Sequence, residues 1–161
     1  MDEPTPALHA LVEAGIPYQV VRTRPARDAA ESAELQDIEL GTLLRTIVVR
    51  RGEDDYVFVL VPGGRRFDWP RLRTQLGVSR LSLPDADEAR RVTGYERGAI
   101  TPFGATRPWP VIADASILGA ERVAIGGGAR GVNVHLSPTD LIASLGATVA
   151  DVTDPERPEA R

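Results

Sequence analysis

The chain has no cysteine among its 161 residues. This absence excludes disulfide bonds, a thiol nucleophile and thiolate metal ligands, so nothing in the composition favours an oxidising compartment. Lysine is absent as well, and all 19 basic residues are arginine. A guanidinium can bind phosphates and carboxylates, but it keeps its proton at every working pH and therefore cannot act as a general base.

Long apolar runs and a basic leader are also missing. The first four residues, Met1 to Pro4, are acidic where a signal peptide would be basic, and no apolar run approaches the length of a membrane span. We therefore expect a cytoplasmic protein with no membrane partner. The only histidines, His9 and His135, lie far apart in the sequence, which predicts no metal site. No G-x-S-x-G motif supports a serine hydrolase.

The charge balance limits the size of any nucleic-acid partner surface. A net charge of −4 leaves no broad basic face for a long duplex, so such a partner would be contacted over a short segment. The hydrophobic content of 42% and the charged content of 26% are ordinary for a soluble domain. The length fits one domain, and no repeat or linker divides it.

The spacing of apolar residues and turn signals predicts helices and strands that alternate along most of the chain. The segment 45–49 and the very apolar segment 56–61 form an expected hairpin, and the latter should be buried on both faces. The hairpin excludes a purely parallel sheet, so we expect a mixed sheet with packed helices. Helices with their caps are predicted at 5–15, 27–35, 68–77, 85–91 and 137–146, and strands at 18–22, 45–49, 56–61, 78–82, 110–114, 122–125, 132–136 and 148–152.

The segment 94–104 is the first candidate for a functional loop. It contains Gly94, Gly98, Pro102 and Gly104, which oppose a regular helix or a central strand. Glycines let a ligand approach the main chain and leave N–H groups unobstructed. An ordinary connection between two elements is the alternative reading.

A second glycine cluster covers residues 126–131 and fits the spacing G-x-G-x-x-G. A dinucleotide site would need a helix to begin at these glycines. An alternating strand follows instead, so a hairpin turn is expected, although its N–H groups could still meet a ligand. His135 faces away from Val134 and Leu136, toward solvent or a site. Asp114, at the end of a strand, is expected to be a structural cap, with an acid or a ligand contact as the alternatives.

Five motifs in register resemble the YbaK and prolyl-tRNA synthetase-associated editing domains. The resemblance runs from about Ile16 to Val152. It implies a single-domain α/β fold with a mixed, barrel-like sheet, covering residues 1–153. The charged, proline-bearing segment 154–161 is expected to be a disordered tail. The motifs are Arg45-Thr46-Ile47-Val48-Val49, Gly94-Tyr95 with Gly98-x-x-x-Pro102-x-Gly104, Val111-Ile112-Ala113-Asp114, Gly127-Gly128-x-Arg130-Gly131, and the start of the helix between Leu136 and Leu141.

The resemblance also implies site residues. The Gly98 to Pro102 loop corresponds to the family loop that holds the aminoacyl ester and its terminal adenosine. The functional lysine of the family falls on Arg45, a common serine on Gly126, and an aspartate on Asn133. The implied catalytic residues are Arg45, Gly98 and Pro102, and the implied substrate-binding residues are Gly94, Ile100, Thr101, Gly104, Gly126, Gly127, Asn133 and His135. No cofactor and no metal are implied.

Arg45 cannot abstract a proton, so it could only hold an anion or stabilise developing charge; an ordinary surface ion pair is the alternative. Loop N–H groups would stabilise the tetrahedral oxyanion of ester hydrolysis, by ~3 kcal/mol per donor. The terminal phosphate or hydroxyl of the tRNA would then align water. Trp69, Phe103 and Trp109 are candidates for stacking on adenine, and Arg45, Arg50 and Arg65 for phosphate contacts.

The resulting hypothesis is a free-standing aminoacyl-tRNA deacylase that edits in trans. Its partner would be the tRNA acceptor end carrying a non-cognate amino acid, and the protein would be a monomer or homodimer. One alternative is a module that binds the aminoacyl-tRNA 3′ end with little or no catalysis. Another is a hydrolase of a different small acyl or nucleotide ester.

Overall fold

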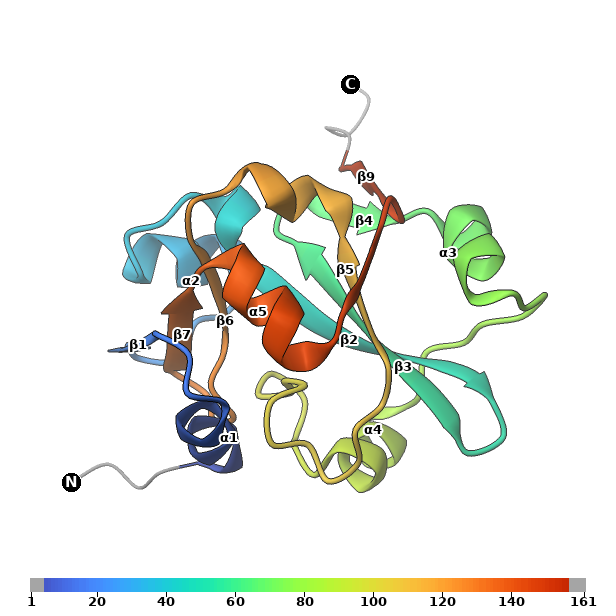
Figure 1. The fold of residues 1–161 in the computed structure, drawn as a ribbon, viewed down its shortest axis with the longest axis horizontal. Helices are drawn as coiled ribbons and strands as arrows, with labels where there is room; N and C mark the ends of the chain where they lie inside the picture. Colours follow the sequence, from blue (N-terminus) through green and yellow to red (C-terminus); the bar gives the residue numbers. More distant parts are fainter. Residues whose placement is uncertain (1–4, 157–161) are drawn as a thin grey trace.

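The computed structural model describes residues 5–156, which fold as helices packed around one mixed sheet and two antiparallel ones (Figure 1). The helices of this part are α1 (Pro6–Ala14), α2 (Ala29–Leu35), α3 (Trp69–Leu76), α4 (Ala86–Thr93) and α5 (Pro138–Leu145), with 3-10 turns η1 (Leu40–Thr42) and η2 (Ala115–Gly119). The strands are β1 (Gln19–Arg22), β2 (Leu44–Gly52), β3 (Asp55–Pro62), β4 (Arg65–Phe67), β5 (Val111–Asp114), β6 (Val123–Gly126), β7 (Val132–Leu136), β8 (Thr148–Ala150) and β9 (Thr153–Pro155).

Side-chain caps begin the helices where the sequence places them. Thr5 accepts from the N–H of Leu8 at the start of α1, and Asp68, Asp85 and Ser137 cap α3, α4 and α5 in the same way. Each of these helices ends at a glycine in the left-handed region, as at Gly77. The predicted helix 27–35 is shorter, because Asp28 caps it and the helix begins at Ala29.

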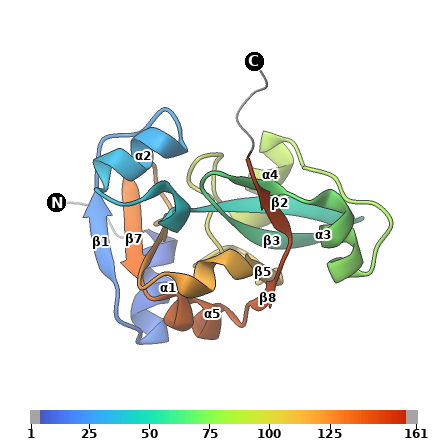
Figure 2. The same ribbon diagram turned by 90° about the horizontal axis from the view of Figure 1, so that it is seen from above.

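The strands form a four-stranded sheet in the order β2-β3-β5-β8, a three-stranded sheet in the order β1-β7-β6 and the pair β4-β9. β3 pairs antiparallel with β2 and parallel with β5, so the prediction of a mixed α/β fold is confirmed. Among the described strands no sheet closes into a barrel; a single bridge between Leu43 and Ala124 connects the two larger sheets. Figure 2 shows these sheets at opposite ends of the molecule.

The core lies on both faces of β3, as predicted. Tyr56, Phe58 and Leu60 pack into a cluster that includes α1, β6 and β7. Their neighbours Val57, Val59 and Val61 pack into a second cluster with residues of α3. β3 is therefore buried on both of its faces and separates two hydrophobic clusters. β2 pairs with it along one edge.

Two predictions about segments at the margins of the sheets are wrong. Residues 78–82 do not form a strand, because only Ser82 makes a bridge, to Arg50. The expected tail does not begin at Asp154: β9 pairs with β4, and Asp154 forms an ion pair with Arg71. The remainder of that tail, residues 157–161, lies outside the described residues. No helix in the described part is long and apolar enough to cross a membrane.

Candidate functional site

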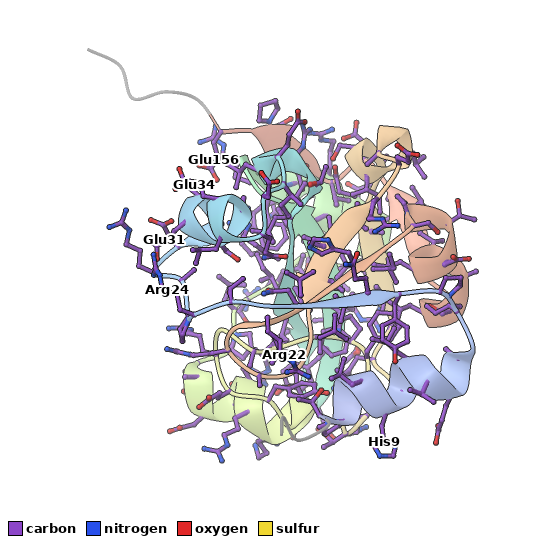
Figure 3. All side chains as sticks on the ribbon, turned by 90° about the vertical axis from the view of Figure 1, so that its left-hand side faces the viewer. His9, Arg22, Arg24, Glu31, Glu34 and Glu156 are labelled. Atoms are coloured by element: carbon purple, nitrogen blue, oxygen red, sulfur yellow. The ribbon has the colours of Figure 1, made fainter. Side chains whose placement is uncertain are left out.

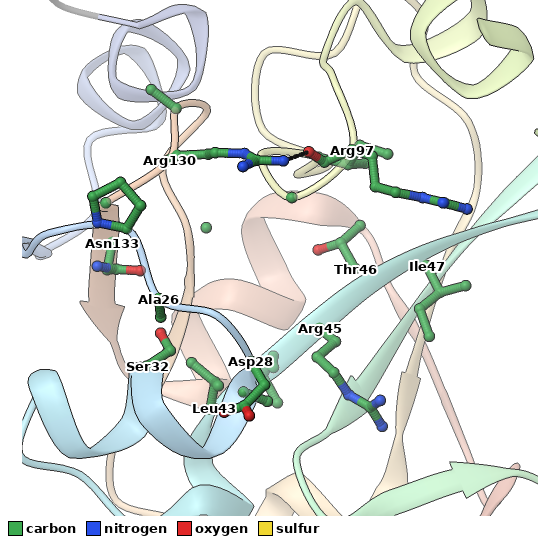
Figure 4. Close-up of a pocket in the computed structure, with 18 of the residues that line it drawn as sticks. Ala26, Asp28, Ser32, Leu43, Arg45, Thr46, Ile47, Arg97, Arg130 and Asn133 are labelled. Carbon is green, nitrogen blue, oxygen red and sulfur yellow. Dashed lines mark hydrogen bonds between the residues drawn. The ribbon is translucent and has the colours of Figure 1, made fainter. Parts of the chain in front are cut away.

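A cavity of about 690 Å³ lies between the β2 edge and the β6-β7 hairpin (Figure 4). The glycine loop and the start of α2 complete its wall. Of the site residues implied by the resemblance, five line it: Arg45, Gly98, Ile100, Gly126 and Asn133. Other lining residues are Thr23, Pro25, Ala26, Arg27, Asp28, Ala29, Ser32, Leu43, Leu44, Thr46, Ile47, Val48, Leu83, Pro84, Ala89, Arg97, Ala129, Arg130, Gly131 and Val132.

The glycine loop reaches the cavity through a tight turn. The N–H of Ala99 donates to the carbonyl of Glu96 at 3.0 Å, and Gly98 takes φ +90°, a left-handed conformation that favours glycine. The main-chain N–H groups of Gly98 and Ile100 have no hydrogen-bond partner in the described part of the chain. Both residues line the cavity.

Two arginines flank this turn at the cavity. The guanidinium of Arg130, from the β6-β7 hairpin, donates to the carbonyl of Arg97 at 3.3 Å (Figure 4). It also lies beside Gly98, where an added Cβ would be 3.3 Å from Nε of Arg130. Both side chains are exposed, and no carboxylate of the described residues forms an ion pair with either. They bring two uncompensated positive charges to the site.

Arg45 is directed differently from its expected role. Its guanidinium donates to the carbonyls of Pro62 and Arg65, and Figure 4 shows it pointing away from Thr46. Successive side chains of a strand alternate between faces, so Arg45 shares a face with Ile47 and the α3 cluster. In this structure the guanidinium braces β2 against the segment that joins β3 and β4, and the expected phosphate contact of Arg45 stays a prediction.

Thr46 occupies the position that faces the cavity (Figure 4). Its hydroxyl is buried and has no hydrogen-bond partner in the structure. A buried hydroxyl without a partner costs free energy, and such groups are commonly satisfied by water or ligand. Thr46 therefore presents an unused hydroxyl at the site, next to Arg45, whose buried Nε also lacks a partner.

The other expected arginine contacts are structural. Arg65 donates to the hydroxyl of Thr153 and lies 3.7 Å from Asp114, while Arg50 lies 3.6 Å from a carboxylate oxygen of Glu88. Asp114 accepts from the N–H groups of Ser116 and Val152, so its predicted capping role is confirmed.

The residues implied for substrate binding are only partly brought together. Asn133 lines the cavity and donates to the carbonyl of Val21 at 3.1 Å. Within the glycine loop, Thr101 is fully buried, and Gly104 packs against the main chain of Pro6. Gly94, Thr101, Pro102, Gly104, Gly127 and His135 do not line the cavity.

The second glycine cluster forms the turn between β6 and β7, which confirms the hairpin prediction. Gly127 donates to the carbonyl of Val132 at 2.8 Å, and its own carbonyl accepts from the hydroxyl of Thr5. β7 follows these glycines directly, so no helix N-terminus meets a ligand there. The turn instead delivers Arg130 to the cavity.

His135 is buried, with 8% of its surface exposed, and so faces neither solvent nor the cavity. Its Nε2 lies 2.9 Å from Oε1 of Gln36, whose amide donates to the hydroxyl of Ser32 at the cavity wall. Burial lowers the pKa of His135 from its ordinary 6.5, and the positive charge of Arg122 lowers it further. His9 is exposed on α1, away from this network (Figure 3).

None of the three aromatic candidates for stacking lines the cavity. Trp69 packs on Phe67, and the indole N–H of Trp109 donates to the carbonyl of Val92. Phe103 is buried in the core. The expected adenine platform is therefore corrected to core packing.

Sequence reasoning missed Thr46, Arg97 and Arg130. Arg130 and Thr46 stood within the matching motifs but had no assigned role. A signal for Thr46 existed in the strand alternation, since it faces opposite to Arg45. The described residues contain no group of three or more His, Cys, Asp or Glu side chains that could hold a metal ion.

Comparison with known proteins adds independent information. A family model described as an aminoacyl-tRNA editing domain matches residues 23–143. A proposed Cys-tRNA(Pro)/Cys-tRNA(Cys) deacylase from Enterococcus faecalis is 24% identical, with 94% of each chain covered. A proline–tRNA ligase from Thermosipho africanus is 28% identical over 71% of this chain and 20% of the ligase.

Solved structures agree with these sequence matches. The crystal structure of a proposed trans-editing enzyme for prolyl tRNA synthetase superposes with a TM-score of 0.86 at 30% identity, covering 95% of this chain and 99% of the other. A hypothetical protein, APE2540, gives a TM-score of 0.85 at 25% identity, covering 92% and 99%.

Proposed function

This chain belongs to the aminoacyl-tRNA editing domain family, and from that premise we propose that it is a trans-editing aminoacyl-tRNA deacylase. It hydrolyses the ester that joins an amino acid to the 3′ end of tRNA. Action as a chain separate from a synthetase is supported by the deacylase-named relative and by the structural neighbour named for trans-editing, each covered over more than nine tenths of its length. The substrate is a tRNA that carries a non-cognate amino acid.

The single observation that carries the proposal is the pair of unpartnered main-chain N–H groups at Gly98 and Ile100, two residues that line the cavity. Ester hydrolysis passes through a tetrahedral oxyanion, and preorganised main-chain donors stabilise that charge by about 3 kcal/mol each. The positive φ of Gly98 holds this turn in place. Pro102 follows it and limits the conformations of the loop.

The cavity wall offers no obvious protein general base. Asp28 is its only carboxylate, and one oxygen caps α2 by accepting from Glu31 while the other lies 3.9 Å from Arg27. Arginines cannot take a proton at working pH. A hydroxyl or phosphate of the terminal nucleotide would therefore align the attacking water.

Arg97 and Arg130 are the side chains best placed to meet the phosphates of the acceptor end. They lie at the cavity without carboxylate partners among the described residues, whereas Arg45 and Arg65 are bound to main-chain carbonyls. A short single-stranded end is compatible with a net charge of −4, because only a few phosphates need to be neutralised. The protein acts as a monomer or a homodimer in the cytoplasm.

A panel of tRNAs, each charged with the correct or an incorrect amino acid, tests the proposal. The expected result is fast release of one non-cognate amino acid, well above spontaneous hydrolysis, with the correctly charged tRNAs spared. Heat-denatured protein and protein with Gly98→Ala are the matched controls. Absence of release from every charged tRNA would refute the deacylase assignment.

The arginine at position 45 and the missing general base favour one alternative, a module that binds the aminoacyl end without turnover. Tight binding of a charged tRNA, with ester hydrolysis at the spontaneous rate, would identify such a module. Release of an acyl group from a small non-tRNA ester alone would identify a different hydrolase.

A further inference from the structure

The outer edge of β2 carries unpaired main-chain groups into the cavity. β2 is the terminal strand of its sheet, and only β3 pairs along its length. The bridge from Leu43 to Ala124 covers one end of the free edge, and the bridge from Arg50 to Ser82 covers the other. Residues 45–48 between them line the cavity, so a ligand there meets a bare strand edge.

The register shows which groups face the ligand. The N–H and C=O of Arg50 both bond to Ser82, at 2.7 and 3.1 Å, and therefore point away from β3. In an antiparallel pair this direction alternates by residue, so the N–H and C=O of Thr46 and Val48 also point outward. The N–H of Phe58, opposite Val48, agrees with this register because it donates to Pro110 beside β5.

Thr46 combines three unused groups at this edge. Its main-chain N–H and C=O point outward, and no turn, loop or sheet hydrogen bond in the described part of the chain uses that side. Its side-chain hydroxyl is buried, unpartnered and directed into the cavity (Figure 4). Val48 also directs its main-chain N–H and C=O outward, but its side chain is apolar. Thr46 therefore offers more hydrogen-bonding groups to a ligand than Val48 does.

We propose that the aminoacyl group docks on the β2 edge as a one-residue strand opposite Thr46, with its free α-amino group donating to the Thr46 carbonyl and hydroxyl oxygens. The inference rests on the proposed deacylase function. An aminoacyl ester has the same N–C–C=O pattern as a strand residue, and such a residue exchanges two hydrogen bonds with its antiparallel partner. The Thr46 N–H then holds the ester carbonyl, beside the glycine loop.

This docking makes the α-amino group a specificity element. An ammonium is a donor only, and its bonds to neutral oxygens are stronger than those of an uncharged donor. Acyl esters without the amine would leave the carbonyl and hydroxyl of Thr46 buried and unpaired. The site would therefore select aminoacyl esters over other acyl esters of tRNA.

The test uses the mischarged tRNA that the protein hydrolyses fastest, with two analogues of its acyl group. One carries a hydroxyl and the other a hydrogen in place of the α-amino group, and each rate is divided by the spontaneous hydrolysis rate of the same ester. We expect kcat/KM to fall in the order amino, hydroxy, hydrogen, with the hydrogen analogue at least about tenfold below the amino ester. Equal normalised rates for all three would overturn the docking while leaving the deacylase function intact.

Two substitutions of Thr46 assign the hydroxyl. Thr46→Val keeps the branched shape and removes the oxygen, so it should reduce the preference for the amino ester over the hydrogen analogue, and Thr46→Ser should retain that preference. Thr148→Val, at an exposed strand position outside the cavity, is the matched control and should change neither rate. If Thr46→Val slowed both esters equally, the hydroxyl would not contact the amine. If no charged tRNA were hydrolysed at all, the deacylase function itself would fail.

Discussion

At the scale of single residues, the site depends on which face of β2 each side chain occupies. Arg45 and Thr46 are neighbours in sequence, yet their side chains point to opposite faces of β2. The guanidinium of Arg45 donates to main-chain carbonyls near β4, whereas the side chain of Thr46 faces the cavity. Strand alternation forces this separation. The guanidinium of Arg45 is therefore used by main-chain carbonyls, and the small hydroxyl of Thr46 is left without a partner at the cavity wall.

Gly98 provides the sharpest residue-level prediction. Alanine at its φ of +90° should cost about 1 kcal/mol of unfolding free energy, and its Cβ would displace Arg130, which lies 3.3 Å away. We expect Gly98→Ala to lower kcat/KM for a mischarged tRNA by about 100-fold, because the loop donors shift. Gly77→Ala is the control, since Gly77 has φ +68° in open space outside the cavity. Equal activity of the two variants would contradict the assigned role.

His135 makes stability depend on pH. Its folded pKa is lowered by burial and then by Arg122, so the unfolded chain binds the proton first as the pH falls. Stability should therefore be fully present above the unfolded pKa of about 6.5 and should decline below it, toward the lower folded pKa. Urea midpoints between pH 7.5 and 5.5 measure this. His135→Gln should flatten the dependence, whereas exposed His9→Gln should retain it.

At the scale of elements, the site is assembled from pieces that are distant in sequence. The start of α1 holds both glycine segments: the Thr5 hydroxyl binds the carbonyl of Gly127, and the main chain of Pro6 contacts Gly104. The hydroxyl of Tyr95 donates to the carbonyl of Phe103 at 2.8 Å, and burial raises its pKa to about 12. It therefore remains a donor and joins the two ends of the loop.

Gly104→Ala tests the packing of α1 against the loop. A Cβ there would lie 2.4 Å from main-chain atoms of Pro6, a contact that requires one of the two segments to move. We expect a loss of about 3 kcal/mol in unfolding free energy, from overpacking and the positive φ together. Gly15→Ala shares a similar φ, +68° against +70°, but meets nothing within 4 Å, so its smaller loss isolates the backbone term. Matching losses in denaturant titrations would show that no clash occurs.

At the scale of the whole molecule, the proposed function requires an acidic protein to bind an anionic partner through a small positive region. Each guanidinium that neutralises a single-strand phosphate should contribute about 0.7 to the slope of log K against log salt concentration. Arg97→Gln and Arg130→Gln should each reduce the slope for tRNA binding by about that amount. Arg66→Gln removes an exposed arginine on β4, outside the cavity, and should not change the slope. Unchanged slopes for Arg97 and Arg130 variants would place the phosphates elsewhere.

The sequence by itself determined the elements and the family. Cap residues such as Asp68, the terminal glycines and the apolar run of β3 are local signals, so the helices, the central hairpin and the mixed sheet could be predicted from them. The failures lie at the edges. Residues 78–82 carry strand-forming residues but meet β2 at a single bridge only, from Ser82 to Arg50, whereas β9 exists because β4 supplies a partner along its length.

The tertiary structure alone decided how the site is composed. Whether Arg45 or Thr46 faces the cavity depends on which side of β2 is covered by α3. Arg130 meets Gly98 only because the β6-β7 hairpin and the glycine loop between α4 and β5 converge. Contacts between segments far apart in sequence have no local signature, since each is set by packing of the whole chain. The sequence therefore specified a site of the right family, and the fold selected the side chains that enter it.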